Sequence, residues 1–455
     1  MDDANVFKVV VDELDGIEFK KLGTDVKGDI YEYLLTYLNT LEGALLGQFR
    51  TPRQIRLAMV AMLDPDLGDT MFDPAAGTGG FLIDAVEHVL AKYSEHPREV
   101  PIYGEEWLDK RGQTIAEAKA AIPNLQTWRK GAGEKIPNWA VLEQSIYGWE
   151  VSRQMMRVSM MNLVLHGIRA AHVKRANALS KMGGLTDEDL RRKYRVVLSN
   201  PPFAGVLPKE SIRGDLATTS KKSEILFLEV VMNSLASGGR AAVIVPEGLL
   251  FGSSTAHVAL RRRLVTDYEL LAVVSLPAGV FKPYAGVKTA ILVFRKPSTG
   301  DEGRAPRERA ADAGSPNTGH PTSGTRRVWF YEVRNDGFDP DKITGGGRGQ
   351  TPEKNDLPDL LRQWSNYKAG GYQTPPGFEA VEILPPGTPD PQCWWAQPST
   401  IAKNDFNIAA GRYKPQVAEA TPEEDPAELI RETLEKERSI VVGFDTLLSE
   451  VEGLR

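Results

Sequence analysis

The sequence predicts an α/β fold, in which a doubly wound, mostly parallel sheet has helices on both faces. Two observations predict it. Short apolar runs of strand length alternate with longer stretches in which apolar residues recur every three or four positions. Glycine or proline follows several of the apolar runs, as in turns that lead from a strand into a helix. Strands that alternate with helices in this way favour a parallel sheet covered on both sides.

The expected elements follow one another along the chain. A helical pattern begins it, at residues 19–46. Strands are expected within the runs of residues 71–77, 145–150, 194–202, 239–248, 270–277, 288–296 and 327–333. Further helices are expected at residues 80–90, 151–168 and 225–236. Strand and helix patterns thus alternate through the first two thirds of the chain.

These patterns divide the chain into segments. Residues 1–46 are expected to form a short helical N-terminal segment, and residues 47–297 the large α/β domain. Residues 298–327 lack Val, Ile, Leu, Met, Phe, Trp and Tyr. Such a segment cannot bury enough apolar surface to offset its loss of conformational entropy, so we expect a flexible low-complexity loop.

The last two segments complete the chain. Residues 328–421 are expected to form the end of the large domain together with an irregular region, rich in Gly and Pro, at residues 336–391. Residues 422–455 combine charged helix formers with apolar residues at helical spacing. We therefore expect a C-terminal helix or helix pair that could dock a partner.

Composition restricts the class of protein. The 455 residues are 41% hydrophobic and 25% charged, which excludes a disordered, collagen-like or disulfide-rich chain and allows two or three domains. The net charge of −6 gives no global basic field, although a local basic face or a second subunit could still contact nucleic acid. The single Cys393 and the six histidines, which include no H-x-x-x-H pair, predict neither a disulfide nor a metal site.

No part of the sequence predicts membrane insertion or export. No apolar stretch approaches the roughly 18 residues that a membrane helix needs. The first residues, MDDANVFKVVVDELDG, are acidic and lack the basic start of a signal peptide. We expect a cytoplasmic protein.

The first motif with chemical content is FDPAAGTGGF at residues 72–81, where a strand ends in a glycine-rich turn and a helix begins. Glycines let the backbone approach a ligand closely, and free N–H groups at the start of a helix attract polar groups. The alternative is a tight turn without a ligand. The spacing departs from G-x-G-x-x-G, so NAD is not the first choice.

The second motif is SNPPF at residues 199–203, directly after an apolar strand. Open α/β sheets bind ligands at the carboxyl ends of their strands. An Asn oxygen and a proline carbonyl can accept both protons of an amino group, while an aromatic ring stacks on the base that carries it. The alternative is that the two prolines only terminate the strand.

Together these motifs resemble a known family, the modification (M) subunits of type I restriction–modification systems, which are S-adenosylmethionine-dependent N6-adenine DNA methyltransferases. The resemblance rests on ordered blocks: GQFRTPR at 47–53, FDPAAGTGGFL at 72–82, SIYGWE at 145–150, MNLVLHGI at 161–168, NPPF at 200–203, LLAVVSLPAGVF at 270–281 and NDFNIAAGRY at 404–413. It implies a sheet of the S-adenosylmethionine-dependent methyltransferase type, with residues 47–297 as the catalytic domain.

The resemblance also implies roles for individual residues. Those that would contact or shape the site for S-adenosylmethionine are Gln48, Phe49, Arg50, Thr51, Pro52, Arg53, Asp73, Gly77, Thr78, Gly79, Gly80, Glu150 and Asn177. Among them Glu150 would accept hydrogen bonds from the ribose hydroxyls, with Glu105 and Glu106 as rivals. The catalytic residues would be Asn200, Pro201, Pro202 and Phe203, which would hold a flipped adenine so that its N6 attacks the methyl group. No metal and no covalent enzyme intermediate would be needed.

The resemblance further implies double-stranded DNA as substrate and a specificity (S) subunit as partner. A second copy of the chain and a restriction (R) subunit would be further members of the complex. The runs Arg261–Arg263 and Lys221–Lys222 could contact phosphate, although such runs are more often solvated faces of helices.

Three departures from the family pattern support an alternative. Only 46 residues precede Gly47, Asn177 replaces an expected acid, and Arg50 and Arg195 stand where the family usually has an aromatic residue and an Asp. The alternative is a catalytically impaired subunit that binds cofactor or DNA and serves assembly. A protein glutamine methyltransferase is a third possibility, because NPP followed by an aromatic residue also occurs in those enzymes.

Overall fold

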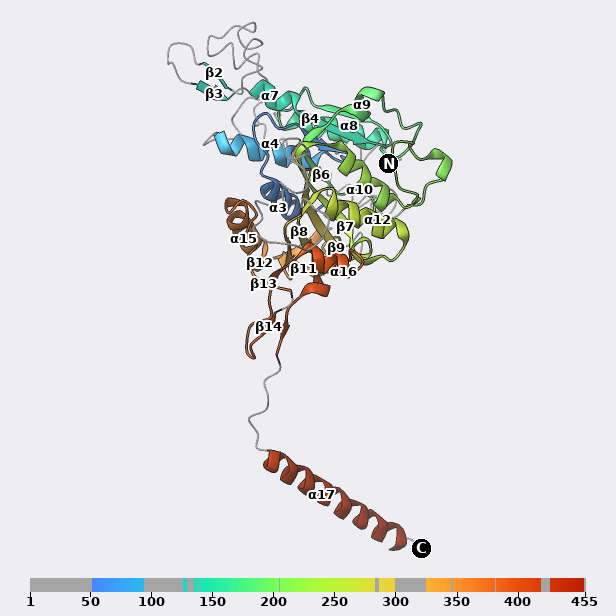
Figure 1. Cartoon of the computed structure of the whole chain (residues 1–455), viewed down its shortest axis with the longest axis vertical. Helices are drawn as coiled ribbons and strands as arrows, with labels where there is room; N and C mark the ends of the chain where they lie inside the picture. The colour runs from blue at the N-terminus through green and yellow to red at the C-terminus, as the bar shows by residue number, and fades with distance from the viewer. Residues whose placement is uncertain are drawn as a thin grey trace, which may run out of the picture. The chain divides into compact units, whose positions relative to one another are not determined.

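The computed structural model describes ten stretches of the chain (Figure 1): residues 51–93, 126–128, 135–137, 139–203, 205–282, 286–298, 325–344, 347–380, 382–418 and 426–453. The described residues form two compact units. The smaller unit takes residues 382–390 and those from 415 onward, and the larger unit takes the rest. The expected helix at 19–46 lies outside the described residues, as do Gln48, Phe49, Arg50, Glu105 and Glu106 and nearly all of the expected loop at 298–327.

The larger unit is built on a ten-stranded sheet in the order β13-β15-β10-β8-β9-β7-β6-β1-β4-β5. The strands are β1 (Met71–Asp73), β4 (Ile146–Glu150), β5 (His172–Arg175), β6 (Tyr194–Ser199), β7 (Leu235–Pro246), β8 (Glu269–Ser275), β9 (Thr289–Arg295), β10 (Val328–Glu332), β13 (Phe378–Glu379) and β15 (Cys393–Ala396). Most neighbours are parallel, which confirms the expected fold class. The exceptions are β9, antiparallel to β7 and β8, and β15, antiparallel to β10.

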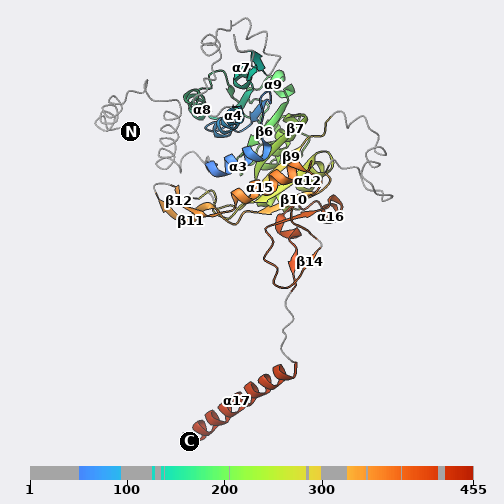
Figure 2. The same ribbon diagram turned by 90° about the vertical axis from the view of Figure 1, so that its left-hand side faces the viewer.

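The helices cover both faces of this sheet (Figure 1). One face packs against α3 (Arg53–Leu63), α4 (Gly80–Tyr93) and α15 (Leu357–Ala369), which face the viewer in Figure 2. The other packs against α10 (Ser223–Ser234) and α12 (Thr255–Thr266). Side chains alternate between the two faces along each strand, so Val196 and Leu198 enter one core and Val197 enters the other.

The strand order reverses between β1 and β6. From β1 the chain proceeds outward to β4 and β5, and then returns to form β6 on the other side of β1. Because β1, β4 and β6 are parallel, their carboxyl ends lie at one edge of the sheet. Ligands of open α/β sheets bind at such a reversal point.

The region at 336–391 is more ordered than the sequence analysis expected. It contains the antiparallel hairpin of β11 (Asp336–Thr344) and β12 (Gly347–Asn355), followed by α15. The buried residues of α15 recur at helical spacing, and the indole N–H of Trp364 donates a hydrogen bond to the Met62 carbonyl (2.8 Å). The expectation of irregularity is wrong for these elements. Gly and Pro in the flanking turns dominate the average composition of the region, so that average does not indicate the short amphipathic helix α15.

The remaining elements are shorter or belong to the smaller unit. The larger unit also contains β2 (Gln126–Trp128), β3 (Lys135–Pro137), α7 (Trp139–Gln144), α8 (Arg153–Leu165), α9 (Asp187–Arg191), α11 (Glu247–Phe251), α16 (Pro398–Lys403) and the 3-10 turns Lys209–Ser211 and Ala410–Tyr413. In the smaller unit, β14 (Ile383–Leu384) pairs in parallel with β16 (Gln416–Val417), and α17 spans Pro426–Gly453. The tail expected to form a helix or helix pair is thus one helix over these residues.

Within the described ranges, no helix combines the length and the apolar character that crossing a membrane requires. Among the same residues, His, Cys, Asp and Glu side chains nowhere gather in groups of three or more that could hold a metal ion.

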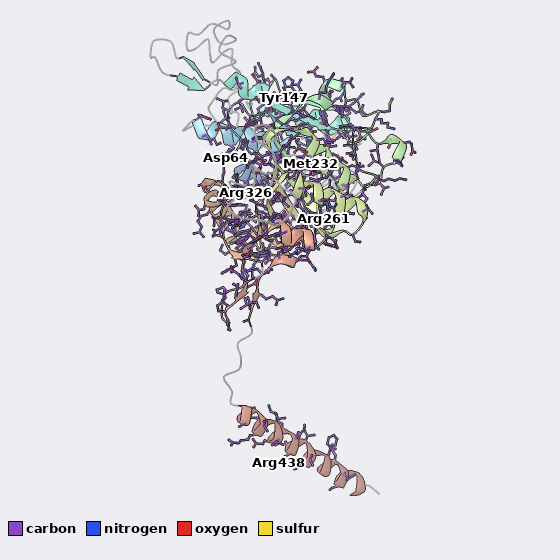
Figure 3. The ribbon with its side chains drawn as sticks, in the orientation of Figure 1. Asp64, Tyr147, Met232, Arg261, Arg326 and Arg438 are labelled. Atoms are coloured by element: carbon purple, nitrogen blue, oxygen red, sulfur yellow. The ribbon has the colours of Figure 1, made fainter. Side chains whose placement is uncertain are left out.

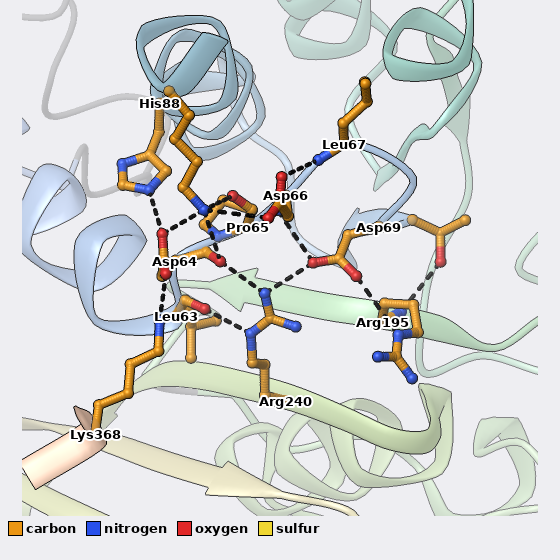
Figure 4. Close-up of polar contacts among 12 residues, drawn as sticks. Leu63, Asp64, Pro65, Asp66, Leu67, Asp69, His88, Arg195, Arg240 and Lys368 are labelled. Atoms are coloured by element: carbon orange, nitrogen blue, oxygen red, sulfur yellow. Dashed lines mark hydrogen bonds and ion pairs between the residues drawn. The ribbon is translucent and has the colours of Figure 1, made fainter. Parts of the chain in front are cut away.

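A network of acidic and basic side chains joins the helices to the amino edge of the sheet (Figure 4). Arg240 of β7 donates to the carbonyls of Leu63 (2.5 Å) and Asp64 (2.8 Å) and to the Asp69 carboxylate (2.8 Å). The Arg195 backbone N–H donates to the Thr70 hydroxyl (3.1 Å). Arg195, one of the departures from the family pattern, therefore lies at the opposite end of β6 from the NPPF motif.

Asp64 is an acid of this network with three side-chain partners. Its carboxylate contacts the ammonium groups of Lys368 and Lys92 and the His88 ring (2.9 Å). Burial by itself would raise the pKa of this carboxyl group, but the hydrogen bonds from Lys368, Lys92 and His88 lower the pKa well below its usual range.

We expect Asp64→Asn to lower the free energy of unfolding at pH 7 by about 1–3 kcal/mol, the range for hydrogen bonds to charged groups. A carboxyl group with a lowered native pKa stabilises the fold above its unfolded pKa of about 3.9 and loses that effect as the pH falls through the native pKa. Wild type and variant should therefore differ less in their free energy of unfolding at pH 3 than at pH 7. An equal difference in free energy of unfolding at both pH values would contradict this account.

Candidate active site

The glycine-rich turn joins β1 to α4 and packs closely onto two other helices. Gly77 and Gly79 have φ values of +52° and +81°, a conformation that favours glycine. A Cβ on Gly79 would lie 2.7 Å from the Ser159 hydroxyl of α8, and one on Gly80 would lie 2.9 Å from the Arg56 guanidinium carbon of α3. Gly77 has only ordinary contacts. Packing therefore requires glycine at positions 79 and 80, while Gly77 leaves the outer side of the turn open.

Buried polar groups beneath the turn fix its position. Arg56 of α3 pairs with Asp84 of α4 (2.6 Å), and both side chains are only 3% exposed. The Asn162 amide of α8 donates to the Thr78 carbonyl (3.0 Å). The sequence motifs alone imply no site role for Arg56, Asp84 or Asn162. A polar residue inside the apolar helical run MNLVLHGI was the signal that could have identified Asn162.

Glu150 ends β4 beside the same turn. Its carboxylate accepts hydrogen bonds from the backbone N–H groups of Gly77 (3.0 Å) and Ser152 (2.8 Å). Burial raises the pKa of Glu150, and the hydrogen bonds from Ser152 and Gly77 oppose that rise. An ionised carboxylate has about four lone-pair directions, so Glu150 retains capacity to accept further hydrogen bonds from a ligand.

A hydrogen bond between neighbouring strands joins the two motifs. The Ser199 hydroxyl of β6 donates to the Asp73 carboxylate of β1 (2.7 Å), whose same oxygen also accepts the Ala75 backbone N–H (2.9 Å). Asp73 is 1% exposed. Burial raises the pKa of Asp73 to about 7, and the nearby Glu150 carboxylate acts in the same direction. Asp73 thus lies beneath the glycine turn, where it shapes the backbone.

Asn200 follows Ser199 directly and has its amide fixed on one side only. Its Nδ2 donates to the Thr51 hydroxyl (2.9 Å), which belongs to the expected GQFRTPR motif. Its Oδ1 is buried and accepts no hydrogen bond from any described residue. A buried acceptor without a partner is costly, so this oxygen is available to a ligand that brings a donor.

Phe203, three residues after Asn200, belongs to an aromatic pair. Phe203 packs edge-on against Phe281, with ring centroids 5.6 Å apart and an interplanar angle of 79°. The sequence motifs alone imply no role for Phe281, although this residue ends the block LLAVVSLPAGVF. An aromatic ring can stack on a planar ligand, and the ring of Phe203 belongs to the same loop as the Asn200 acceptor.

Asn177, Pro52, Arg53, Pro201 and Pro202 are the remaining expected site residues that the structure describes. Asn177 follows Ala176, whose N–H donates to the Glu150 carbonyl (2.9 Å), and the Asn177 side chain accepts the Leu179 backbone N–H (3.0 Å). Pro52 precedes the first residue of α3. Arg53 points to Glu87 (3.6 Å) with its side chain 43% exposed. Pro201 is buried and Pro202 is exposed.

Comparison with known proteins identifies the family. The family model for N-6 DNA Methylase matches residues 22–127 and 138–422. The chain belongs to this family. The expectation from the sequence motifs is therefore confirmed at the level of the family.

Several relatives in this family are type I methylase subunits. The chain is 31% identical over 336 residues to the type I restriction enzyme EcoEI methylase subunit of Escherichia coli, covering 73% of this chain and 54% of the relative. It is 28% identical over 317 residues to the EcoKI methylase subunit of Escherichia coli strain K12, covering 68% and 48%. The chain thus spans about half the length of these relatives.

Solved structures with the same fold include a chain from a type I R-M system, with a TM-score of 0.59 and 24% identity over 98% of this chain and 75% of that one. The EcoKI M protein gives a TM-score of 0.54 and 21% identity over 90% and 75%. At this identity the likeness shows the fold, and it confirms the α/β methyltransferase type of sheet.

The raised pKa of Asp73 predicts that its contribution to the free energy of unfolding depends on pH. Its native pKa of about 7 exceeds the unfolded value of about 3.9, so the native state binds more protons between these two pH values. The contribution of this group to stability therefore falls as the pH rises from about 4 to 7. Asp73→Asn keeps an oxygen that can accept both hydrogen bonds but cannot ionise.

We expect the stability of Asp73→Asn relative to wild type to increase between pH 5 and pH 8, measured by thermal unfolding. Asp359→Asn is a matched control, because the pKa of Asp359 is lowered and its carboxyl group stays ionised throughout this range. Identical pH profiles for wild type and Asp73→Asn would contradict the assignment.

Proposed function

We propose that this chain transfers a methyl group from S-adenosylmethionine to N6 of adenine in double-stranded DNA, as the modification subunit of a type I restriction–modification complex. Membership of the N-6 DNA methylase family supports the reaction class. The observation that carries the proposal is the buried Asn200 Oδ1, which lacks a partner among the described residues. Phe203, three residues further along the chain, pairs with Phe281. A buried acceptor in a loop that also carries an aromatic residue suits a planar base with an exocyclic amine.

The glycine turn and Glu150 fit S-adenosylmethionine. The turn leaves Gly77 open, and the first N–H groups of α4 favour a carboxylate such as that of the methionine moiety. Glu150 would accept hydrogen bonds from the ribose hydroxyls with the lone pairs that Gly77 and Ser152 leave free. S-adenosylmethionine supplies a methyl group on a positively charged sulfur, which takes the electrons of the broken sulfur–carbon bond.

Asn200 and Pro201 would hold the adenine amine. The Asn200 Oδ1 would accept one N6 proton and the Pro201 carbonyl the other, which directs the nitrogen lone pair away from the protein backbone. The Thr51 hydroxyl fixes the amide so that its oxygen, rather than its nitrogen, faces the ligand. Phe203 would stack on the base, with Phe281 behind it as a support. Asn177, close in sequence to the Glu150 partner Ala176, would contact the adenine ring of the cofactor.

Helix α17 is the element that we propose for docking the S subunit. Ile430, Leu434, Val441, Phe444 and Leu448 follow one another at intervals of four, seven, three and four residues, and each is 48–67% exposed. This spacing is typical of the apolar seam of a coiled coil. The other proposed partners are double-stranded DNA, a second copy of the chain and an R subunit, all in the cytoplasm.

The test is transfer of labelled methyl from S-adenosylmethionine to unmethylated genomic DNA by the full chain, co-expressed with its neighbouring S-type subunit and followed by nucleoside analysis. We expect N6-methyladenine from the wild type. Asn200→Ala should lower the rate at least ~100-fold, since removal of one group that acts in the transition state costs about that much. The exposed Asn366→Ala on α15 is the matched control and should retain the wild-type rate.

Two other outcomes would contradict the proposal. Cofactor binding without any modified base, with the S-type subunit present, would assign the chain to the assembly role. Methyl transfer to protein glutamine instead of DNA would assign it to the glutamine methyltransferases.

A further inference from the structure

A concave region of the larger unit lies outside the candidate active site, between α12 and α16. This α12–α16 groove has a volume of about 830 Å³. Its lining residues come from two segments, one from the end of α11 into α12 and the other from the last residue of α16 to the 3-10 turn Ala410–Tyr413. They include five basic side chains and one acid, namely Arg261, Arg262, Arg263, Lys403, Arg412 and Asp405. Such a concentration of positive charge contrasts with the net charge of −6 of the whole chain.

One buried arginine holds the walls of the groove together. Arg261, labelled in Figure 3, is 1% exposed and donates to the carbonyls of Leu249 (3.0 Å) and Gly252 (2.8 Å) on one wall. On the other wall it donates to the carbonyls of Phe406 (2.7 Å) and Asp405 (3.3 Å). These bonds join α11 and α12 to the segment after α16, so the groove has a fixed floor.

Three cations at the groove have no ion-pair partner among the described residues. Arg263 pairs with Glu229 (2.7 Å), and the Arg261 charge faces carbonyl groups. By contrast, Arg262, Lys403 and Arg412 are exposed. Arg262 lies over the Phe406 ring at 5.1 Å, and Arg412 donates twice to the amide oxygen of Asn404 (3.1 and 2.7 Å). Their charges are therefore available to an anionic ligand.

The groove is reached from the same edge of the sheet as the candidate active site. Strand β7 is parallel to β6, whose carboxyl end carries Asn200, and the neighbouring strands of a sheet are about 5 Å apart. Helix α11 begins directly after β7 and ends at Phe251, a groove residue 52% exposed. Five helical residues span about 8 Å. A long polyanion with one base at Asn200 could therefore extend to the groove.

We infer that the α12–α16 groove binds the phosphate backbone of the nucleic acid substrate, through Arg262, Lys403 and Arg412. The inference rests on the proposed function and adds a contact surface to it. Arg guanidinium groups match the geometry of phosphate oxygens, and an exposed aromatic ring such as Phe251 among cations is typical of nucleic-acid surfaces. The alternative occupant is an acidic polypeptide, which the adjacent position of the proposed base site disfavours.

The experiment measures binding of the full chain to a fluorescent non-specific DNA duplex by anisotropy over a series of salt concentrations. Arg262→Gln/Arg412→Gln removes two charges from the groove. Arg326→Gln/Arg362→Gln removes two exposed charges elsewhere, at the amino end of β10 and on α15, and is the matched control. Binding of S-adenosylmethionine by each variant reports whether the fold is retained, and polyglutamate is a second probe.

We expect the groove variant to bind the duplex about tenfold more weakly at low salt. The slope of log K against log salt should also fall by about 2, because each lost phosphate contact removes about 0.9. The control should keep the wild-type slope, and both variants should bind S-adenosylmethionine like wild type.

Three results would overturn the inference. Wild-type slope and affinity in the groove variant would reject the groove alone and leave the proposed function standing. Loss of polyglutamate binding in the groove variant, with DNA binding intact, would assign the groove to an acidic polypeptide. Absence of DNA binding by the wild type would reject the groove as a phosphate site, while the methyl-transfer experiment with the S-type subunit tests the proposed function separately.

Discussion

The hydrogen bond from Ser199 to Asp73 connects the two parts of the proposed active site, the NPPF loop and the glycine turn. It joins residues 126 positions apart, at the carboxyl ends of two adjacent strands where the strand order reverses. On one side Asp73 shapes the glycine turn, and on the other Ser199 precedes Asn200. The bond between Asn200 and Thr51 adds the start of α3 to the same assembly. A cofactor turn and a base-binding loop can therefore act as one site.

Most of the sheet could be predicted from the sequence, because buried strands such as β6 and β8 are continuous apolar runs. The edge strand β5 could not be predicted, because its residues are mostly polar. The antiparallel position of β9 between β7 and β8 could not be predicted either, because neither pattern nor composition determines the order of strands in a sheet. The same holds for the site. The glycine turn and NPPF have local signatures, whereas the pairing of Arg56 with Asp84 and of Phe203 with Phe281 depends on tertiary contacts between distant segments.

Positive and negative side chains are distributed unevenly over the chain. The overall charge is −6, yet cations concentrate at the α12–α16 groove. Arg195, which departs from the family pattern, contributes to the network at the amino edge and lies at the far end of β6 from Asn200. A chain that contacts DNA at a limited surface and presents an apolar seam on α17 suits a complex in which another subunit reads the sequence.

The central claim is that the glycine turn, Glu150 and Asn200 form a single site for S-adenosylmethionine and an amine. A crystal structure of the full chain with sinefungin, an analogue whose amine replaces the transferable methyl group, tests it most directly. The account predicts ribose hydroxyls bonded to Glu150, the amino-acid part over Gly77, and the analogue's amine facing the Asn200 Oδ1. An analogue bound elsewhere, or with its amine directed away from Asn200, would contradict it.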